Sequence, residues 1–306
     1  MPDREKSTLV RRLAATSIAV AVTVMAIKFG AWWLTGSVAL YSDALESIVN
    51  VIAATAAFGA ISYAQRPADT DHPFGHYKAE YMSAVLEGVL IVLAALLILR
   101  EAVTTLMSGE AAIAAPGPGL GLNLLAAVIN GVFATILIRT GRSARSPALV
   151  ADGRHIMADV VTSAGVLAGL LLALATGWLW LDPVLAILVA ANIVREGWHV
   201  ISESLNGLMD RAVTGDEEER IRAAILANGG GAMEVHDIRT RTAGPLTFIE
   251  FHLVVDGKMT VEQSHAICDR IEDGLRGEMP GARIVIHVEP DFKAKDEALK
   301  LEQTQA

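Results

Sequence analysis

The sequence predicts an α-helical membrane protein that ends in a small soluble α+β domain, and three observations support this prediction. Hydrophobic residues make up 53% of the 306 positions, and the mean hydropathy of +0.44 is high for a soluble chain. The apolar residues gather in blocks, several of which reach the roughly 20 residues that a helix needs to cross a bilayer. After residue 206 these blocks stop, and charged, alternating segments begin.

Six apolar blocks are long enough to span a membrane. The first has no small-residue cleavage site after a short apolar core, so we interpret it as a true span rather than a signal peptide. The six predicted helices cover residues 13–34, 38–64, 80–107, 117–139, 147–176 and 178–201. We therefore expect three regions: a six-helix transmembrane domain (1–206), a cytoplasmic metal-binding and dimerisation domain (207–291) and a flexible tail (292–306).

Basic residues predict the orientation of these spans. The loops at residues 34–37, 108–119 and 175–178 contain no Lys or Arg. The opposite side of the membrane carries Arg4, Lys6, Arg11, Arg12, Arg66, Lys78, Arg139, Arg142, Arg145 and Arg154. The positive-inside rule then places both termini in the cytoplasm, as expected for a multi-pass protein of the inner (cytoplasmic) membrane.

The soluble domain shows the element order α-β-β-α-β. Helical spacing and strand alternation predict these elements at residues 215–228, 235–243, 246–256, 260–277 and 282–290. Thr260 and Gln263 have the spacing of a capping box at the start of the second helix. This order suits a small open sheet with helices on one face.

Charge and cysteine content narrow the function classes. Residues 207–306 carry 12 basic and 19 acidic side chains, which argues against nucleic acid as a partner and fits a cation-handling role. The single cysteine, Cys268, excludes an intrachain disulfide and a thiolate metal cluster within one chain.

The second predicted span carries a polar stripe. Asp43, Glu46, Ser47 and Asn50 fall on one helical face, because they are spaced three, four and seven residues apart. Ionisable residues cost at least about 2.5–3.5 kcal/mol each at the centre of a bilayer, so they are candidates for function.

The fifth predicted span repeats this geometry with Asp152, His155 and Asp159. Two such faces turned toward each other would offer carboxylate, amide and imidazole donors, a set that suits Zn²⁺ and also admits Mn²⁺, Fe²⁺ or Co²⁺. The alternative is that these residues only hold helices together through hydrogen bonds.

The loop after the second span holds a further group of candidate ligands. Asp69, Asp71, His72 and His76 lie within eight residues, and a Pro and a Gly between the histidines bend the backbone so that they could converge. A solvated loop with incidental histidines is the alternative interpretation.

Histidine is also concentrated in the soluble domain. Four of the eight histidines lie there, near acidic residues: His236, His252, His265 and His287. They indicate either metal binding or a structural role in the sheet.

With these residues in place, the chain resembles the cation diffusion facilitators, a family of proton-coupled exporters of zinc and related divalent metals. The similarity is greatest to the bacterial branch of ferrous-iron and zinc efflux pumps, and it runs from about residue 10 to residue 291. Its most specific parts are "WWLTGSVAL" (32–40), "PADTDHPFGHYKAE" (67–80), "HIMAD" (155–159), "LMDRA" (208–212) and "HDIRTRTAGPLTFIEFHL" (236–253).

The resemblance implies three metal sites in a homodimer with a ferredoxin-like soluble domain. The implied transport site consists of Glu46, Asn50, His155 and Asp159. Asp43, Ser47 and Asp152 are not among these ligands, and we expect them to support the ligands as neighbours on the same two helices. The implied loop site consists of Asp69, His72 and His76. The implied binuclear cytoplasmic site consists of His236, His252, His265, His287 and Glu289. Lys78 and Asp210 match an ionic lock between subunits.

The chain departs from the family pattern in two places, the second span and the soluble domain. Bacterial relatives usually carry Asp or His first and Asp second in the second span, where this chain has Glu46 and Asn50. Asparagine is a neutral oxygen donor with no proton to exchange, so the charge of the site changes and the choice among Zn²⁺, Fe²⁺, Mn²⁺ and Co²⁺ stays open. Glu289 stands where many relatives have Asp, and either carboxylate can coordinate a metal.

The expected function is efflux of a divalent cation, Zn²⁺ first, by proton antiport. Metal would be both the cargo and a structural or regulatory ion, with no organic cofactor. Histidine suits the exchange because its unperturbed pKa of about 6.5 lies near working pH. An intramembrane metalloenzyme is the rival, but the sequence has neither H-E-x-x-H nor G-x-S-x-G. A metal sensor or scaffold would not require ligands at the bilayer centre.

Overall fold

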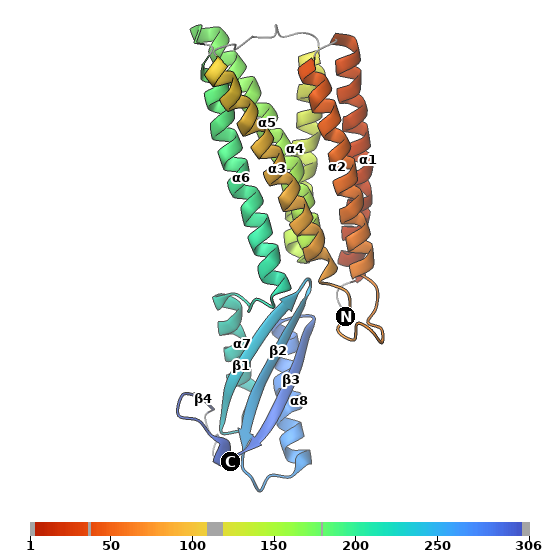
Figure 1. Cartoon of the computed structure of the whole chain (residues 1–306). Coiled ribbons are helices and arrows are strands. Elements are labelled where there is room, and N and C mark those ends of the chain that lie inside the picture. Colours follow the sequence, from red (N-terminus) through yellow and green to blue (C-terminus); the bar gives the residue numbers. More distant parts are fainter. Residues whose placement is uncertain (1–3, 36–37, 109–118, 179, 302–306) are drawn as a thin grey trace. The chain divides into compact units, whose positions relative to one another are not determined.

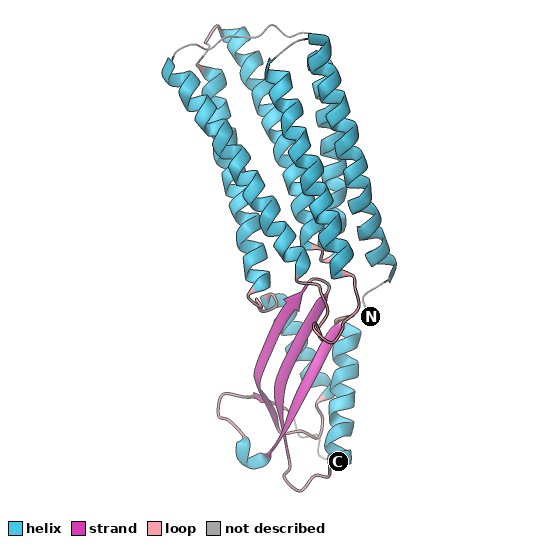
Figure 2. Cartoon of the chain, turned by 45° about the vertical axis from the view of Figure 1, so that its right-hand side comes forward, coloured by secondary structure: helices cyan, strands magenta, loops and turns pink. Residues whose placement is uncertain are grey.

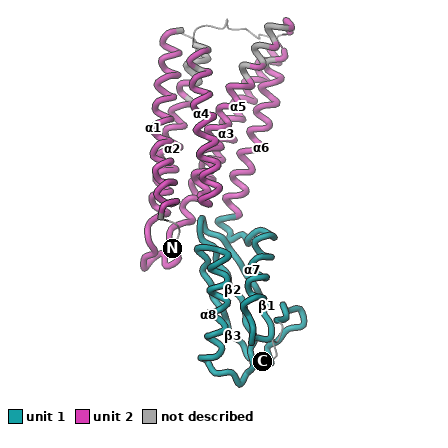
Figure 3. Tube along the Cα trace, turned by 180° about the vertical axis from the view of Figure 1, so that it is seen from behind, with its two compact units in different colours: residues 1–4, 207–306 teal, residues 5–206 magenta. Residues whose placement is uncertain are grey.

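The computed structural model describes residues 4–35, 38–108, 119–178 and 180–301. The chain divides into two compact units, Glu5–Asn206 and a smaller unit from Gly207 onward (Figure 3). The two units differ in composition in the way that the sequence predicts, since the first is built from apolar helices and the second from a mixed sheet and helices.

The larger unit consists of long helices (Figure 1), because a backbone in hydrocarbon must satisfy its own hydrogen bonds. They are α1 (Arg4–Thr35), α2 (Val38–Ala64), α3 (Ala79–Ser108), α4 (Gly119–Ala144), α5 (Pro147–Thr176) and α6 (Leu181–Leu208). The predicted class, a helical membrane domain followed by an α+β domain, is confirmed.

Five of the six helices contain a described stretch that is long and apolar enough to cross a membrane. These stretches are Glu5–Leu34, Ser47–Ala64, Ala79–Ser108, Leu124–Ala144 and Pro183–Leu208. The remaining helix, α5, carries the polar residues Asp152, Arg154 and Asp159 in its first half, and several side chains of its second half lie outside the described part of the structure.

Small residues fill the contacts between these helices. Gly88 of α3 faces Gly197 of α6 so closely that a Cβ on Gly88 would lie 3.1 Å from the Gly197 carbonyl oxygen. Gly153 of α5 approaches α4 in the same way, since its Cβ would lie 3.1 Å from the carbonyl oxygen of Ala134. Close backbone approach at small residues is typical of helix packing in membranes. As a result α5 packs against α2, α3 and α4 and its polar face is held inside the bundle.

The smaller unit is a four-stranded sheet with two helices on one face (Figure 2). In chain order its elements are α7 (Gly215–Asn228), β1 (Glu234–Ala243), β2 (Leu246–Val255), α8 (Val261–Glu278), β3 (Ala282–Pro290), the 3-10 helix η1 (Asp291–Lys293) and β4 (Leu299–Lys300). The strand order is β3-β2-β1-β4, with β1 antiparallel to β2 and β2 parallel to β3. The predicted α-β-β-α-β order is therefore confirmed.

The ends of α8 and its buried face follow from the sequence. The Gln263 N–H donates to the Thr260 hydroxyl (3.2 Å), and the Thr260 N–H donates to the Gln263 side chain (3.0 Å), so the predicted capping box is present. Ile267, Ile271 and Leu275 lie on one face of the helix and are buried against the sheet.

The segment from residue 292, expected as a flexible tail, is described as far as Leu301. It includes β4, which pairs antiparallel with β1, and the Leu301 N–H donates to the carbonyl of Met233 (3.1 Å). The side chain of Leu301 is buried in the domain core and Leu299 packs against that core. The physical reason is the pair of leucines two residues apart, which gives an otherwise polar segment one apolar edge. Residues 302–306 lie outside the described part.

Candidate metal sites

The polar faces of α2 and α5 meet inside the larger unit. His155 Nε2 lies 2.8 Å from Asn50 Oδ1, and Asn50 Nδ2 donates a hydrogen bond to Asp159 Oδ2. Asn50 and His155 are buried, and Asp159 is partly exposed. His155 and Asp159 are one turn apart on α5, so both reach the same side chain of α2. The structure thus brings together three of the four residues that the resemblance implies for the transport site.

The amide of Asn50 connects the other two groups through its opposite ends. Its oxygen faces the His155 ring nitrogen and its N–H faces the Asp159 carboxylate. A metal ion here would take the amide oxygen, an imidazole nitrogen and a carboxylate oxygen, all of them donors for a borderline divalent cation. In this structure these donor atoms are hydrogen-bonded to one another, so an ion would have to replace these contacts.

The remaining predicted residues of this region are described to different extents. The side chains of Asp43 and Glu46 lie outside the described part of the structure. Ser47 is buried on α2, one turn before Asn50. Asp152 is buried on α5 and interacts electrostatically with His155, which is compatible with a supporting role.

Glu87 of α3 was missed by the sequence reasoning. Its side chain is only 1% exposed, and it interacts electrostatically with Asp152. Neither of its carboxylate oxygens has a hydrogen-bond partner within the described ranges. The sequence does indicate this residue, because a Glu in the apolar block 80–107 is an intramembrane ionisable residue like those in the second and fifth predicted spans.

The loop between α2 and α3 brings its candidate ligands together. The Asp69 carboxylate lies 3.3 Å from His72 Nδ1 and 3.4 Å from His76 Nε2, and the two imidazole rings are 4.5 Å apart between centroids. His76 is buried and packs edge-on against Tyr63 of α2 (4.7 Å between centroids). The three side chains form a compact group that could hold a metal ion.

Asp69 also organises the backbone of this loop. Its Oδ1 accepts hydrogen bonds from the N–H groups of Asp71 (3.1 Å) and His72 (2.7 Å). The hydrogen bond from the His72 N–H is the main reason that the pKa of Asp69 lies below its ordinary value, so the carboxylate is ionised and ready to bind a cation. Gly75, at φ +87°, makes the turn that returns His76 toward Asp69. The side chain of Asp71 is not part of the group formed by Asp69, His72 and His76.

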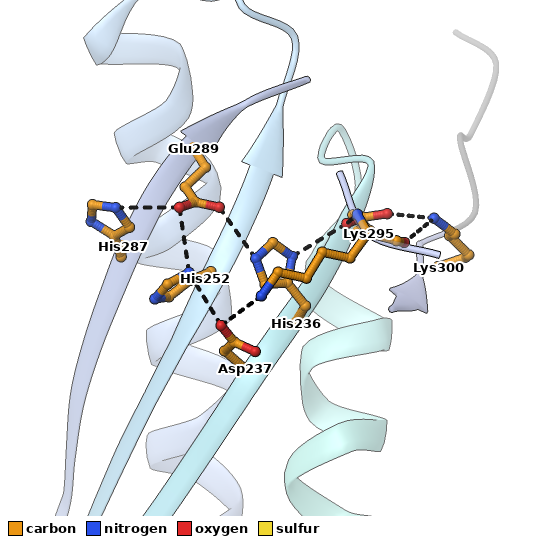
Figure 4. Close-up of polar contacts among 8 residues, drawn as sticks. His236, Asp237, His252, His287, Glu289, Lys295 and Lys300 are labelled. Carbon is orange, nitrogen blue, oxygen red and sulfur yellow. Dashed lines mark hydrogen bonds and ion pairs between the residues drawn. The ribbon is translucent and has the colours of Figure 1, made fainter. Parts of the chain in front are cut away.

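In the smaller unit, Glu289 joins three histidines from three strands (Figure 4). One of its oxygens lies 3.2 Å from His236 Nε2, and the other lies 3.4 Å from His252 Nδ1 and 3.6 Å from His287 Nε2. The residues meet because His236 is opposite His252, which is opposite His287, in the sheet register. Four of the five residues implied for the cytoplasmic site are therefore neighbours.

The atoms of this cluster fit a metal ion. His236 Nε2 and His252 Nδ1 are buried and, among the described residues, have no partner in hydrogen-bond geometry. Buried imidazole nitrogens without a hydrogen bond are costly unless something else binds them. A second contact of His236, from Nδ1 to Glu234 Oε1 (3.3 Å), leaves Nε2 as the nitrogen that faces the cluster.

Asp237, which follows His236 on β1, lies against the same cluster. Its Oδ2 is 3.9 Å from His252 Nδ1, and its φ of +51° coincides with a bulge in the pairing of β1 with β2. The bulge changes the strict alternation of the strand, so that adjacent residues reach one site. His236, Asp237 and His252 offer ligand atoms within 4.8 Å of one another.

Two lysines of the C-terminal segment neutralise the acidic residues beside the cluster (Figure 4). Lys295 Nζ lies 2.8 Å from Asp237 Oδ2, and this hydrogen bond is the main reason that the pKa of Asp237 is below its ordinary value. Burial opposes ionisation of Glu234. Hydrogen bonds from the Lys300 ammonium, the Lys295 N–H and His236 outweigh it, so the pKa of Glu234 is also lowered.

Comparison with known proteins decides the family. The family model for the cation efflux transmembrane domain matches residues 14–209, and the model for the cytoplasmic domain of cation efflux proteins matches residues 213–291. The chain belongs to the cation efflux family. Members of this family are transporters, not enzymes, and the predicted family is confirmed.

Relatives of this cation efflux protein match it along most of its length. The uncharacterized transporter sll1263 of Synechocystis sp. is 42% identical over 288 residues, which are 92% of this chain and 91% of the relative. The cation-efflux pump FieF of Salmonella newport is 30% identical over 294 residues, or 96% and 97% of the two chains. Among solved structures, the Zn form of CzrB is 47% identical, covers 28% of this chain and 98% of its own, and has a TM-score of 0.27.

The remaining predicted residues of the cation efflux protein are His265, Asp210 and Lys78. His265 is exposed on α8, 3.7 Å from Asp269, and is not among the four neighbouring residues of the cytoplasmic cluster. Asp210 lies 3.3 Å from Arg241 within the smaller unit. Lys78 belongs to the larger unit, so its predicted pairing with Asp210 stays a prediction.

Proposed function

We propose that this cation efflux protein exports a divalent metal ion, Zn²⁺ first, in exchange for protons. The observation that carries the proposal is the contact of Asn50 on α2 with His155 and Asp159 on α5. Donor groups of three chemical types converge there from two helices, in the part of the chain that matches the family's transmembrane domain.

The donor set supports a borderline divalent cation. Imidazole favours Zn²⁺ and other late first-row metals, while carboxylate and amide oxygens also accept Mn²⁺ and Fe²⁺. With Glu46 as the fourth ligand, the site would carry two carboxylates, which balance the charge of a divalent ion. Export of Fe²⁺, Mn²⁺ or Co²⁺ by the same site is the alternative, and a competition transport assay with these ions distinguishes it.

Proton coupling follows from the chemistry of the ligands. Metal binding requires an unprotonated imidazole and unprotonated carboxylates, so capture of the ion releases protons, and protonation from the other side expels the ion. His155 is the group that we assign to this exchange, because Asn50 has no proton to give up. The helices α2 and α5 would then tilt to expose the site alternately to each side.

The rest of the proposal concerns the membrane location, the other two candidate metal sites and the oligomeric state. We place the protein in the cytoplasmic membrane with both termini in the cytoplasm, as the distribution of Lys and Arg indicates. We propose that the loop group and the cytoplasmic cluster bind metal ions that the protein does not transport. The match to the cytoplasmic domain of the family supports a homodimer, with Lys78 and Asp210 as the expected ionic lock.

Zinc-driven proton flux in proteoliposomes tests the proposal. We expect wild-type protein to move protons when Zn²⁺ is added and Asp159→Ala to lose this flux almost completely, because the site loses a charged ligand. Asp216→Ala on α7 changes an exposed carboxylate outside the three groups and serves as the matched control. Equal flux through wild type and Asp159→Ala would show that the proposed site is wrong.

A further inference from the structure

The C-terminal strap, defined here as residues 291–301, is fixed to the sheet beside the histidine cluster. The Lys300 ammonium donates to Glu234 Oε2, and the Lys295 N–H donates to Glu234 Oε1 (2.7 Å). The buried side chain of Leu301 anchors the end of the strap in the domain core. The strap is therefore held at three points, and two of them involve the same buried carboxylate.

The strap places an ammonium group against an atom that a metal ion would use. Lys295 Nζ donates to Asp237 Oδ2 (2.8 Å), the oxygen that lies 3.9 Å from His252 Nδ1 (Figure 4). Asp237 is one of three residues whose ligand atoms lie within 4.8 Å of one another. A metal ion bound between them would stand next to the lysine, and the two positive charges would repel each other.

Two histidine nitrogens and the Glu289 carboxylate together present a donor set suited to a cation, since His236 Nε2 and His252 Nδ1 lie 3.2 and 3.4 Å from its oxygens. His236 Nε2 and His252 Nδ1 are buried without a hydrogen-bond partner among the described residues. They are separate from the hydrogen bonds of the strap. The cluster thus combines two nitrogen donors beside Glu289 with a second carboxylate, Asp237, that the strap already holds.

We propose that the strap competes with metal for the cytoplasmic cluster, through Lys295 on Asp237. This inference rests on the proposed function, because it takes the cluster to be a metal site. When the strap is attached, Lys295 neutralises Asp237 and weakens metal binding. When metal binds, Asp237 turns from the ammonium to the ion and the strap loosens.

Competition of this kind is reciprocal. The factor by which an attached strap weakens metal binding equals the factor by which bound metal weakens strap attachment. Lys300 has a different role, because its partner Glu234 contacts His236 Nδ1 rather than the nitrogens that face Glu289. Lys300 and Leu301 keep the strap near the sheet, so that its release is local and reversible.

Hydrogen exchange of the full-length protein in detergent, titrated with Zn²⁺, tests the proposal. The amide of Lys295 reports strap attachment, since it is hydrogen-bonded to Glu234, and the amide of Leu301, hydrogen-bonded to Met233, is the internal reference for the part that stays anchored. Peptides that carry His252 and His287 report metal at the cluster. We expect Zn²⁺ to slow exchange in these peptides and to speed exchange in the strap, and His252→Ala to abolish both changes.

Two matched lysine variants measure the competition itself. Lys295→Met should lower the Zn²⁺ midpoint of the cluster by about fivefold, the scale of one partly exposed ion pair. Lys293→Met removes the same charge from the same segment, at an exposed position outside the cluster, and should leave the midpoint unchanged. Equal midpoints for Lys295→Met and wild type would overturn the proposal.

The remaining outcomes separate this inference from the proposed function. If Zn²⁺ protects the histidine peptides but strap exchange stays the same, the cluster binds metal and the competition is wrong. If Zn²⁺ changes neither readout, the cluster is not a metal site, and both this inference and the proposed metal role of the cytoplasmic cluster fail.

Discussion

Asn50 gives the intramembrane group a neutral amide at a position where a carboxylate would add a second like charge beside Asp159. The amide N–H donates to Asp159 and the amide oxygen faces His155 Nε2, so Asn50 contacts both other side chains without a metal ion. A carboxylate at this position could not donate, and two carboxylates in contact would disfavour the metal-free state. The asparagine therefore reduces the dependence of the fold on bound metal.

The variant Asn50→Asp tests this role. We expect the metal-free protein to be destabilised by about 1–3 kcal/mol, because a hydrogen bond becomes a repulsion. Saturating Zn²⁺ should recover most of the loss, since the ion neutralises both carboxylates. Thermal unfolding with and without Zn²⁺ measures this difference. Asn130→Asp, at a buried position of α4, should be destabilised equally under both conditions. If Zn²⁺ raises the melting temperature of Asn50→Asp by the same amount as that of wild type, Asn50 is not a ligand.

Cys268 gives a residue-scale prediction with a pH dependence. Burial in the core of the smaller unit raises the pKa of its thiol, and Glu272 and Asp269 act in the same direction. Iodoacetamide should therefore label the native protein at pH 8 roughly 100-fold more slowly than the urea-unfolded protein. Because the folded pKa is raised, the thiol stabilises the fold below the unfolded pKa, and this contribution is lost as pH rises through the folded value. Equal labelling rates would show that the thiol is accessible.

At the scale of elements, the helices and strands of both units follow from apolar periodicity, strand alternation and capping residues. The ends of α7 and α8 could be predicted because acidic first turns and the Thr260–Gln263 pair mark them. The strap could not be predicted in this way, since β4 is two residues long and its burial depends on Leu299 and Leu301 meeting a core built by distant residues.

The candidate sites likewise differ in how far the sequence alone predicts their contacts. Helical spacing alone places His155 and Asp159 on one face, and a short loop alone brings Asp69 toward its histidines. The approach of Asp237 to His252 depends on a bulge and a positive φ, which leave no pattern in the sequence. Glu87 had a sequence signal, but its neighbour Asp152 is known only from the packing of α3 against α5.

The close contact of α3 with α6 predicts that a larger side chain at this point disrupts helix packing in the larger unit. A Cβ on Gly88 would lie 2.7 Å from Ile201 and 3.1 Å from the Gly197 carbonyl, so Gly88→Val should destabilise the protein by about 1–3 kcal/mol. Gly59→Val on α2 is the control, because a Cβ there meets nothing within 4 Å. Thermal unfolding of the purified protein measures both variants. Equal melting temperatures for them would contradict the packing of α3 on α6.

At the scale of the whole molecule, the chain combines a membrane unit that holds one candidate transport group with a second unit that holds a separate cluster of candidate metal ligands. The sequence contains neither G-x-S-x-G nor H-E-x-x-H, and the family consists of transporters. The central claim is that ion movement and proton movement depend on the same three side chains, and above all on His155, which can carry a proton.

Zinc uptake into proteoliposomes under an imposed pH gradient tests this claim most directly. We predict that uptake follows the gradient, reverses when the gradient is reversed and is lost in His155→Ala. His199→Ala should transport like wild type, because that histidine is exposed on α6, 3.6 Å from Glu203 and outside the site. Uptake that ignores the gradient, or uptake by His155→Ala at the wild-type rate, would contradict the claim.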